Sequence, residues 1–278
     1  MATDVSFLGP GSQPEESEGV LQFMEMPRSM TTFHAPALPE PEDATTLKGG
    51  MAALAAIVDA LASWSDGACL CVPLDGLDAA NLDFVDQALG EGEVSIVCGS
   101  DIQVQESVLA GVWRVRTVTP DGRLAADAVE IGAFPQSVRA RLGATTRPQM
   151  TPPSAFGPEV FNAPSLLTEI ADRVAGPRTP GQPHVINLSL LPHTEADLAL
   201  IDRTLGQGNV TVLSRGYGNC RVISTAIADV WWVRFYNSQD TLILNSIEVT
   251  DIPEVVCAAP EDIADSRERL EEILQVYR

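Results

Sequence analysis

Two glycine pairs are the first residues of this sequence whose spacing could do chemistry. Gly90-Glu91-Gly92 lies in LGEGEV, and Gly206-Gln207-Gly208 lies in LGQGNV. A glycine-rich turn that opens a helix can bind phosphate through its backbone amides, but such a loop follows a strand and carries a third glycine or a Lys-Ser/Thr pair. Here each pair follows a helical pattern and precedes a strand-like run. We therefore predict two structural corners, in which a glycine ends the helix in the left-handed conformation, and Glu91 is an exposed candidate for contact with a partner.

The cysteines are the next candidates for chemistry. There are five, with no CxxC pair and no zinc-like spacing: Cys69, Cys71, Cys98, Cys220 and Cys257. Cys69 and Cys71 would share one face of a strand, which leaves a redox or metal-binding role open, although buried and inert thiols are the favoured interpretation. Neither serine nor cysteine has the sequence context of a nucleophile. We predict no catalytic residue, no metal and no cofactor, and hence a protein that is not an enzyme.

Aromatic residues supply two candidate contacts for a partner protein. Gly216-Tyr217-Gly218 predicts a turn between two strands, where Tyr217 is either a packed residue or a rigid binding anchor. Trp231 is expected in the core, because it aligns with Trp113 of an earlier strand. Trp232 then projects from the opposite face, where the earlier strand has Arg114, and an exposed Trp232 would be a contact candidate.

A duplication explains why these features recur. LGEGEV aligns with LGQGNV at an offset of 116 residues, and GVWRVR and VEIGAFP align with DVWWVR and IEVTDIP at an offset of 118. A period this long indicates a tandem duplication of a domain, because solenoid repeats are far shorter.

Each copy reads as the order α-β-α-β-β-β-β. In copy one, Leu54, Ile57 and Leu61 have helical spacing, Asp78 is a plausible cap for a second helix, and Pro120-Asp121-Gly122 predicts a hairpin turn. The pattern predicts an α+β fold with largely antiparallel sheets. The expected divisions are an extended N-terminal arm (1–44), repeat domain 1 (45–142), a Pro-rich linker (143–163), repeat domain 2 (164–253), and an acidic C-terminal segment with a helix (254–278).

Charge limits the possible partners. The chain carries 17 basic and 38 acidic residues, a net charge of −21. Nucleic acid and anionic membrane surfaces are unfavourable partners for such a chain, whereas a basic protein is favoured, unless the acidity serves only solubility. In the C-terminal segment, Glu254, Glu261 and Asp262 are candidate contacts for a basic partner, or they stabilise the helix dipole.

Nothing in the sequence predicts membrane insertion or secretion. No stretch approaches the roughly 18 uninterrupted apolar residues of a membrane span, and the N-terminal residues lack the basic and apolar regions of a secretory signal. We expect a cytoplasmic protein.

The order of the motifs resembles that of the HupH/HyaF family of nickel–iron hydrogenase expression/formation proteins. The motifs that carry the resemblance run along nearly the whole chain: FLGPGSQP, LGEGEVSI followed by GVWRVR, INLSLLPHTEADL, LGQGNV, RGYGN and IPEVVCAAPEDIADS.

This resemblance implies a non-enzymatic accessory chaperone. Its expected partner is the iron–sulfur small-subunit precursor of the hydrogenase. The chaperone would hold this precursor in the cytoplasm until it joins the large subunit and is exported by the twin-arginine route. The signal peptide of the precursor and a second accessory protein are further implied partners. Two alternatives stay open: a scaffold that carries or protects an iron–sulfur intermediate, and a thiol-redox enzyme that uses Cys69 and Cys71.

Overall fold

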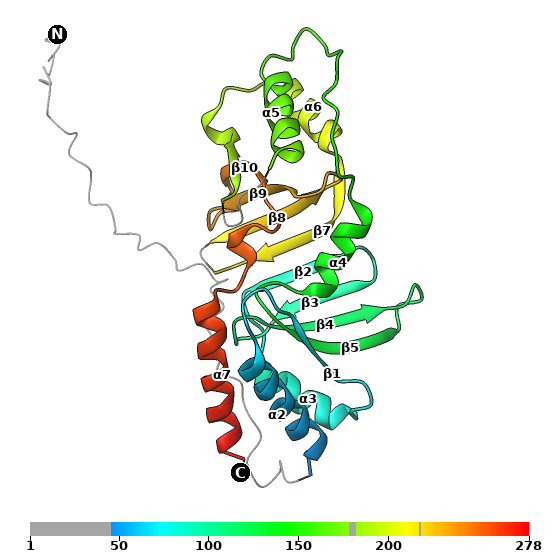
Figure 1. The fold of residues 1–278 in the computed structure, drawn as a ribbon, viewed down its shortest axis with the longest axis vertical. Helices are drawn as coiled ribbons and strands as arrows, with labels where there is room; N and C mark the ends of the chain where they lie inside the picture. Colours follow the sequence, from blue (N-terminus) through cyan, green and yellow to red (C-terminus); the bar gives the residue numbers. More distant parts are fainter. Residues whose placement is uncertain (1–45, 178–181, 217, 278) are drawn as a thin grey trace, which may run out of the picture. The chain divides into compact units, whose positions relative to one another are not determined.

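A computed structural model describes residues 46–177, 182–216 and 218–277 (Figure 1). The expected N-terminal arm and Tyr217 lie outside the described residues. Copy one consists of α2 (Lys48–Ser63), β1 (Leu70–Pro73), α3 (Ala79–Leu89), β2 (Val94–Cys98), β3 (Ile102–Glu106), β4 (Val112–Val118), β5 (Leu124–Ile131) and α4 (Gln136–Thr145). Copy two consists of α5 (Ala163–Ala175), β6 (His184–Asn187), η1 (Leu188–Leu190), α6 (Glu195–Leu205), β7 (Gln207–Ser214), β8 (Asn219–Thr225), β9 (Val230–Tyr236), β10 (Leu242–Val249), η2 (Glu254–Val256) and α7 (Pro260–Gln275).

All ten strands belong to one sheet, with the order β1-β5-β4-β3-β2-β7-β8-β9-β10-β6. The second half repeats the order of the first half in reverse, and every strand pairs antiparallel with its neighbours. The copies join where β2 pairs with β7, from Val94 opposite Ser214 to Cys98 opposite Val210. The predicted α+β class and the tandem duplication are confirmed, and the two copies share a single sheet rather than forming one each.

Local sequence explains how the helices next to this junction begin and end. The Asp78 carboxylate caps α3 by accepting the N–H of Asn81, and Thr194 caps α6 in a reciprocal capping box with Asp197. Each helix ends at the first glycine of a predicted corner: Gly90 has φ 58° and Gly206 has φ 66°.

The second glycine of each corner is required by close packing. A Cβ at Gly92 would lie 2.9 Å from the carbonyl carbon of Ser107, and one at Gly208 would lie 2.7 Å from that of Ser224. The corners are therefore places where backbone passes close to backbone.

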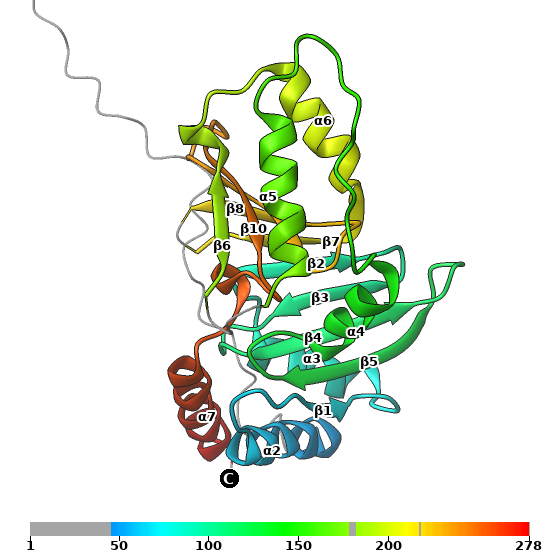
Figure 2. The same ribbon diagram turned by 45° about the horizontal axis from the view of Figure 1, so that its top comes forward.

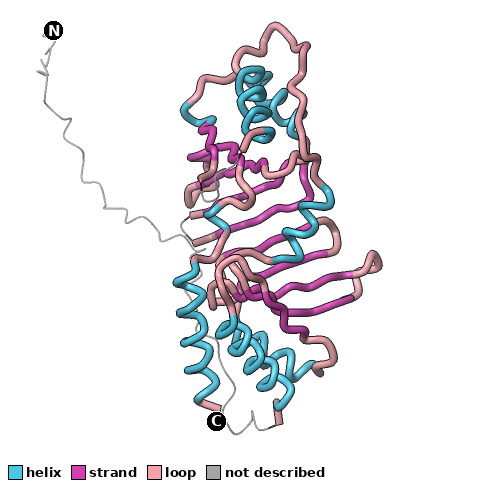
Figure 3. Tube along the Cα trace, in the orientation of Figure 1, coloured by secondary structure: helices cyan, strands magenta, loops and turns pink. Residues whose placement is uncertain are grey.

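The helices divide between the two faces of the sheet (Figures 2 and 3). On one face, which we call the helical face, α2 and α3 pack on β1, β4 and β5, while α5 and α6 pack on β6, β9 and β10. The opposite face, which we call the α4 face, buries a core shared by both copies, including Ile96, Trp113, Val212 and Trp231, beneath Val138 of α4.

The terminal helix of each copy contacts the other copy. Helix α7 follows copy two but packs against α2, and buries Ile263, Leu270 and Leu274 in the core of copy one. Helix α4 follows copy one but contacts β7, and its Arg139 forms an ion pair with Asp251. No helix among the described residues is long and apolar enough to cross a membrane.

Candidate functional site

The duplication produces two equivalent pockets on the α4 face. Each lies between the β-corner of one copy and the terminal helix that arrives from the other copy. We call them the α4 pocket and the α7 pocket. Their linings correspond in part at the offset of 118 residues: Ser224 and Ala228 of the α4 pocket match Glu106 and Ala110 of the α7 pocket.

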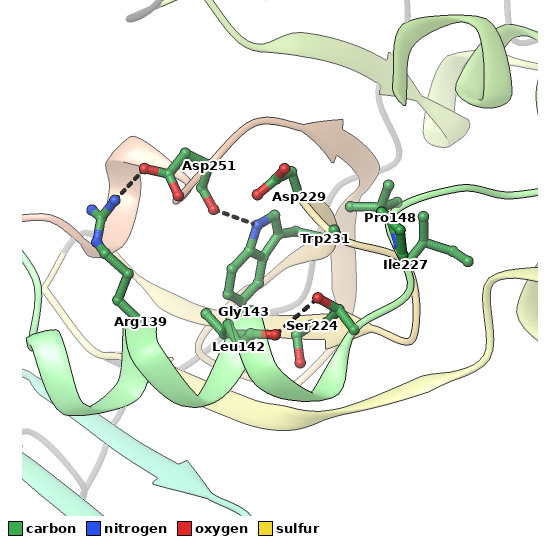
Figure 4. Close-up of a pocket in the computed structure, with 12 residues that line it drawn as sticks. Arg139, Leu142, Gly143, Pro148, Ser224, Ile227, Asp229, Trp231 and Asp251 are labelled. Carbon is green, nitrogen blue, oxygen red and sulfur yellow. Dashed lines mark hydrogen bonds and ion pairs between the residues drawn. The ribbon is translucent and has the colours of Figure 1, made fainter. Parts of the chain in front are cut away.

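The α4 pocket has a volume of about 380 Å³ and an aromatic wall formed by Trp231 (Figure 4). The Trp231 indole N–H donates to the backbone carbonyls of Thr250 and Asp251, at 3.2 and 3.1 Å. Arg139 pairs with the Asp251 carboxylate. The charges at this mouth are therefore partly neutralised within the chain.

The α7 pocket is smaller, about 210 Å³, and is acidic. Three carboxylates line it, those of Glu93, Glu106 and Asp262, and its described lining contains no arginine or lysine. Its apolar lining includes Val94, Phe235 and Val255. A long basic side chain could lay its alkyl stem on such apolar surface and place its charged end against the carboxylates.

Glu106 is the electrostatic centre of the α7 pocket. The pKa of its carboxyl is raised to about 7, mainly by burial and also by the negative charges of Glu93 and Asp262, although the N–H groups of Gly111 and Val94 oppose the shift. The Gly111 N–H donates to Glu106 Oε1 at 3.4 Å. A bound cation would favour the ionised carboxylate, so this pocket is electrostatically suited to a positive group.

Several candidates from the sequence meet at this pocket. Asp262 and both glycines of the GYG loop, Gly216 and Gly218, line it. Glu254 and Glu261 are exposed on η2 and α7, and Glu91 is exposed at the corner before β2. Tyr217 lies outside the described residues.

Trp232 corrects one expectation. It lies on the predicted face and is equivalent to Arg114, but only 5% of it is exposed. It packs in the core beneath α5 and α6, and the Arg234 guanidinium lies 4.7 Å from its ring centroid. The alternation of β9 gave the correct face, but helices far away in the sequence cover that face. Trp232 is therefore not an exposed partner contact.

Sequence reasoning missed Glu93 and Glu106. A signal for Glu106 was present, because Ile102 and Val104 alternate inward and the next inward position of β3 is a carboxylate. A charged residue at an inward position of a strand is costly unless it has a partner or a function.

The five thiols are held in their neutral form. Burial raises the pKa of all five, to about 12 for Cys220 and about 11 for Cys257, both of which line the α7 pocket. Thiolates are the reactive and metal-binding form. Among the described residues, no group of three or more His, Cys, Asp or Glu side chains is arranged to hold a metal ion.

The comparisons with known proteins agree with one another. The family described as "HupH hydrogenase expression protein, C-terminal conserved region" matches residues 48–144 and 160–277. Hydrogenase expression/formation protein HoxQ of Cupriavidus necator is 47% identical, over 98% of this chain and 96% of that protein. Hydrogenase expression/formation protein HupH of Rhodobacter capsulatus is 44% identical over 97% and 96%, and hydrogenase-1 operon protein HyaF of Escherichia coli is 32% identical over 96% and 94%.

Proposed function

This chain belongs to the HupH family of hydrogenase expression/formation proteins, and from that premise we propose that it is an accessory chaperone of nickel–iron hydrogenase maturation. It binds the iron–sulfur small-subunit precursor in the cytoplasm, before the precursor joins the large subunit and is exported by the twin-arginine route. The mechanism is reversible protein–protein binding without catalysis. A second accessory protein acts with it.

The observation that carries this proposal is the acidic α7 pocket. Glu93, Glu106 and Asp262 surround a space with apolar walls, and no described arginine or lysine of the chain lines it. This chemistry fits a basic side chain presented by a partner, such as one from the signal region of a precursor. The net charge of −21 adds long-range attraction for a basic segment.

The test is retention of the precursor by the tagged full-length protein. We expect the protein to retain a small-subunit precursor, and to release it progressively as salt is raised, because screening weakens contacts between exposed charges. Replacing both accessible carboxylates, Glu93→Gln with Asp262→Asn, is expected to weaken binding about tenfold, equivalent to about 1.4 kcal/mol. The readout is the dissociation constant at physiological ionic strength, with and without the signal peptide.

A matched variant separates the pocket from net charge. Glu159→Gln with Asp83→Asn removes the same two charges from exposed positions that do not line the α7 pocket, and we expect it to bind as the wild type does. Equal weakening by both pairs would assign the effect to net charge rather than to the pocket. If the protein retains no form of the precursor, the proposed function is wrong.

Replacing both Cys69 and Cys71 with alanine tests the thiol alternatives. Burial raises the pKa of both thiols, and the nearby Glu130 carboxylate raises it further, so few thiolates form at neutral pH. We expect the double variant to keep precursor binding and hydrogenase maturation at wild-type levels. Maturation lost while the fold and binding are retained would favour the redox or iron–sulfur scaffold alternative.

A further inference from the structure

The middle of the helical face is open. Helices α2 and α3 cover one end of this face and α5 and α6 cover the other end. Between them lies a central strip formed by β3, β2, β7 and β8, most of whose helical-face side chains are partly or fully exposed, and Val97 is 53% exposed. The strip includes Ser95, Val97, Gln103, Thr211, Arg221 and Ile223.

Two arginines lie side by side at the border of this strip. Arg221 on β8 and Arg234 on β9 are directly opposite in the strand register. Their guanidinium groups lie over aromatic rings, Arg221 at 4.9 Å from the Tyr236 centroid and Arg234 at 4.7 Å from the Trp232 centroid. We call these two residues the arginine pair.

Within the residues that the structure describes, the arginine pair has no counter-charge. No carboxylate in the described part of the chain lies within 4.0 Å of either guanidinium, and the polar contact of Arg234 is a 3.4 Å hydrogen bond to Asn245 Oδ1. Like charges directly opposite on a sheet are destabilising. In a chain with only 17 basic residues against 38 acidic ones, this arrangement is unexpected.

The equivalent place in copy one is neutralised. There Arg114 and Arg116 contact Asp86 and Asp127, with Arg114 Nη2 2.6 Å from Asp127 Oδ2 and Arg116 Nη2 3.1 Å from Asp86 Oδ2. These two arginines therefore have two carboxylates of their own chain.

Copy two has changed part of this network. At the offset of 118 residues, Trp232 replaces Arg114, Asn245 replaces Asp127, and Arg221 replaces Gln103. Arg234 keeps the position of Arg116, and Asp202 keeps the position of Asp86 at the offset of 116 residues, but no carboxylate of the described residues lies within 4.0 Å of Arg234. The result is two outward-facing guanidinium groups with no described carboxylate within 4.0 Å, beside an exposed strip that contains Val97 and Ile223.

From this asymmetry we propose that the central strip and the arginine pair bind an acidic, extended segment of a partner protein. A carboxylate of the segment takes the place that Asp127 occupies in copy one and Asn245 occupies in copy two, and the remaining side chains of the segment lie along β8, β7 and β2. This surface is on the opposite face of the sheet from the α7 pocket, so the inference does not depend on the proposed basic ligand of that pocket.

The duplication itself supplies the variants for the test. Arg221→Gln installs the residue that copy one has at this position, and Asn245→Asp installs the carboxylate of copy one next to Arg234. Both changes reduce the uncompensated positive charge, so we expect both variants to keep or raise the wild-type Tm. Loss of binding in these variants therefore cannot be attributed to unfolding.

The probe is a fluorescein-labelled peptide of alternating Glu and Thr, compared with a Gln–Thr peptide by fluorescence anisotropy on the full-length protein at physiological ionic strength. We expect the Glu–Thr peptide to bind about tenfold more tightly than the Gln–Thr peptide, and Arg221→Gln and Asn245→Asp each to remove most of that difference. Glu93→Gln with Asp262→Asn should leave it unchanged.

Two results would overturn the inference. One is equal affinity for the two peptides, or Glu–Thr binding that neither variant weakens. The other is displacement of the probe by a synthetic peptide of residues 1–45, which contains eight carboxylates and one arginine, more effectively than by unlabelled Glu–Thr peptide. That outcome would assign the surface to a segment of this chain instead of a partner.

Discussion

Replacing Asp197 with alanine is expected to lower the free energy of unfolding by about 3–5 kcal/mol. Its fully buried carboxylate joins the first turns of α5 and α6. Oδ1 accepts the backbone N–H groups of Phe161, Asn162 and Ala163 at 2.9, 3.0 and 2.9 Å, and Oδ2 accepts the Thr194 N–H at 2.9 Å. Alanine would leave these four donors without their acceptor beside the core, and urea unfolding at pH 7 measures the cost.

The loss of unfolding free energy in Asp197→Ala should become smaller as the pH falls. Burial alone raises the pKa of Asp197, but the N–H groups of Ala163, Thr194 and Phe161 outweigh it and lower the pKa from 3.8 to about 2. Because the folded-state pKa is depressed, the ionised carboxylate stabilises the fold above about pH 4, and this contribution is lost as the pH falls from about 4 to about 2. The stability difference between wild type and Asp197→Ala should therefore narrow over that range.

Copy one contains the matched control. Asn81 stands at the position of Asp197 and accepts the Gly50 N–H of α2 at 2.7 Å through its neutral side chain. Asn81→Ala is expected to cost about 1–2 kcal/mol. The Asn81 amide also donates to the exposed Asp78 carboxylate at 2.8 Å and helps to lower its pKa, so this cost should also fall toward pH 3, but less than the cost of Asp197→Ala does. A constant difference for Asp197→Ala across the same range would contradict the assigned role of its charge.

Short-range patterns of the sequence predict the strands and helices well where one face is buried. The turn predicted at Pro120-Asp121-Gly122 joins β4 and β5, and the predicted cap Asp78 begins α3. These signals are local, because turn geometry and capping depend on residues only a few positions apart. The order of elements within each copy follows from them.

The features that the sequence did not predict all depend on contacts between distant segments. Helix α4 buries only Val138 and is held by ion pairs of Arg139 with Asp251 and of Arg141 with Asp101, so it has almost no apolar periodicity. The pairing of β2 with β7 and the burial of Trp232 likewise depend on segments far away in the chain.

The candidate site could likewise be predicted only in part, because it depends on contacts between distant segments. Asp262 and the GYG glycines could be singled out as unusual residues of the tail and the loop, but their common pocket exists only because α7 crosses to copy one. Glu93 and Glu106 belong to ordinary-looking strand ends. Their importance comes from the neighbours that the crossing helix brings to them.

Gly111→Ala is the second change with a large expected effect on stability, because it acts on the contact between α7 and copy one. Gly111 has φ 74°, and an added Cβ would lie 2.8 Å from Ile263 Cδ1 of α7 and 3.2 Å from the Gly132 carbonyl oxygen. Backbone strain costs about 1 kcal/mol, and overpacking adds about 1–3 kcal/mol. We expect a loss of about 3 kcal/mol in urea unfolding, together with faster amide hydrogen exchange along Pro260–Gln275.

Gly122→Ala separates the cost of backbone strain from the cost of overpacking. Gly122 has a similar φ of 79°, but nothing lies within 4 Å of an added Cβ, so this variant should lose only about 1 kcal/mol and keep the exchange protection of α7. Equal costs for the two variants would show that strain alone acts and that α7 is not displaced.

Ile263→Val in the Gly111→Ala background completes the argument. Ile263 is fully buried, so Ile263→Val alone should cost about 1 kcal/mol. Valine removes Cδ1, which the new Cβ would approach to 2.8 Å, but keeps the nearer Cγ1. The double variant should therefore be more stable than the sum of the two single changes predicts, but by less than about 1 kcal/mol. Asp262 stands next to Ile263 and lines the α7 pocket; if the pocket binds the precursor, Gly111→Ala should weaken that binding and the second substitution should restore part of it. Rescue of stability without rescue of binding would separate the packing of α7 from the function of the pocket.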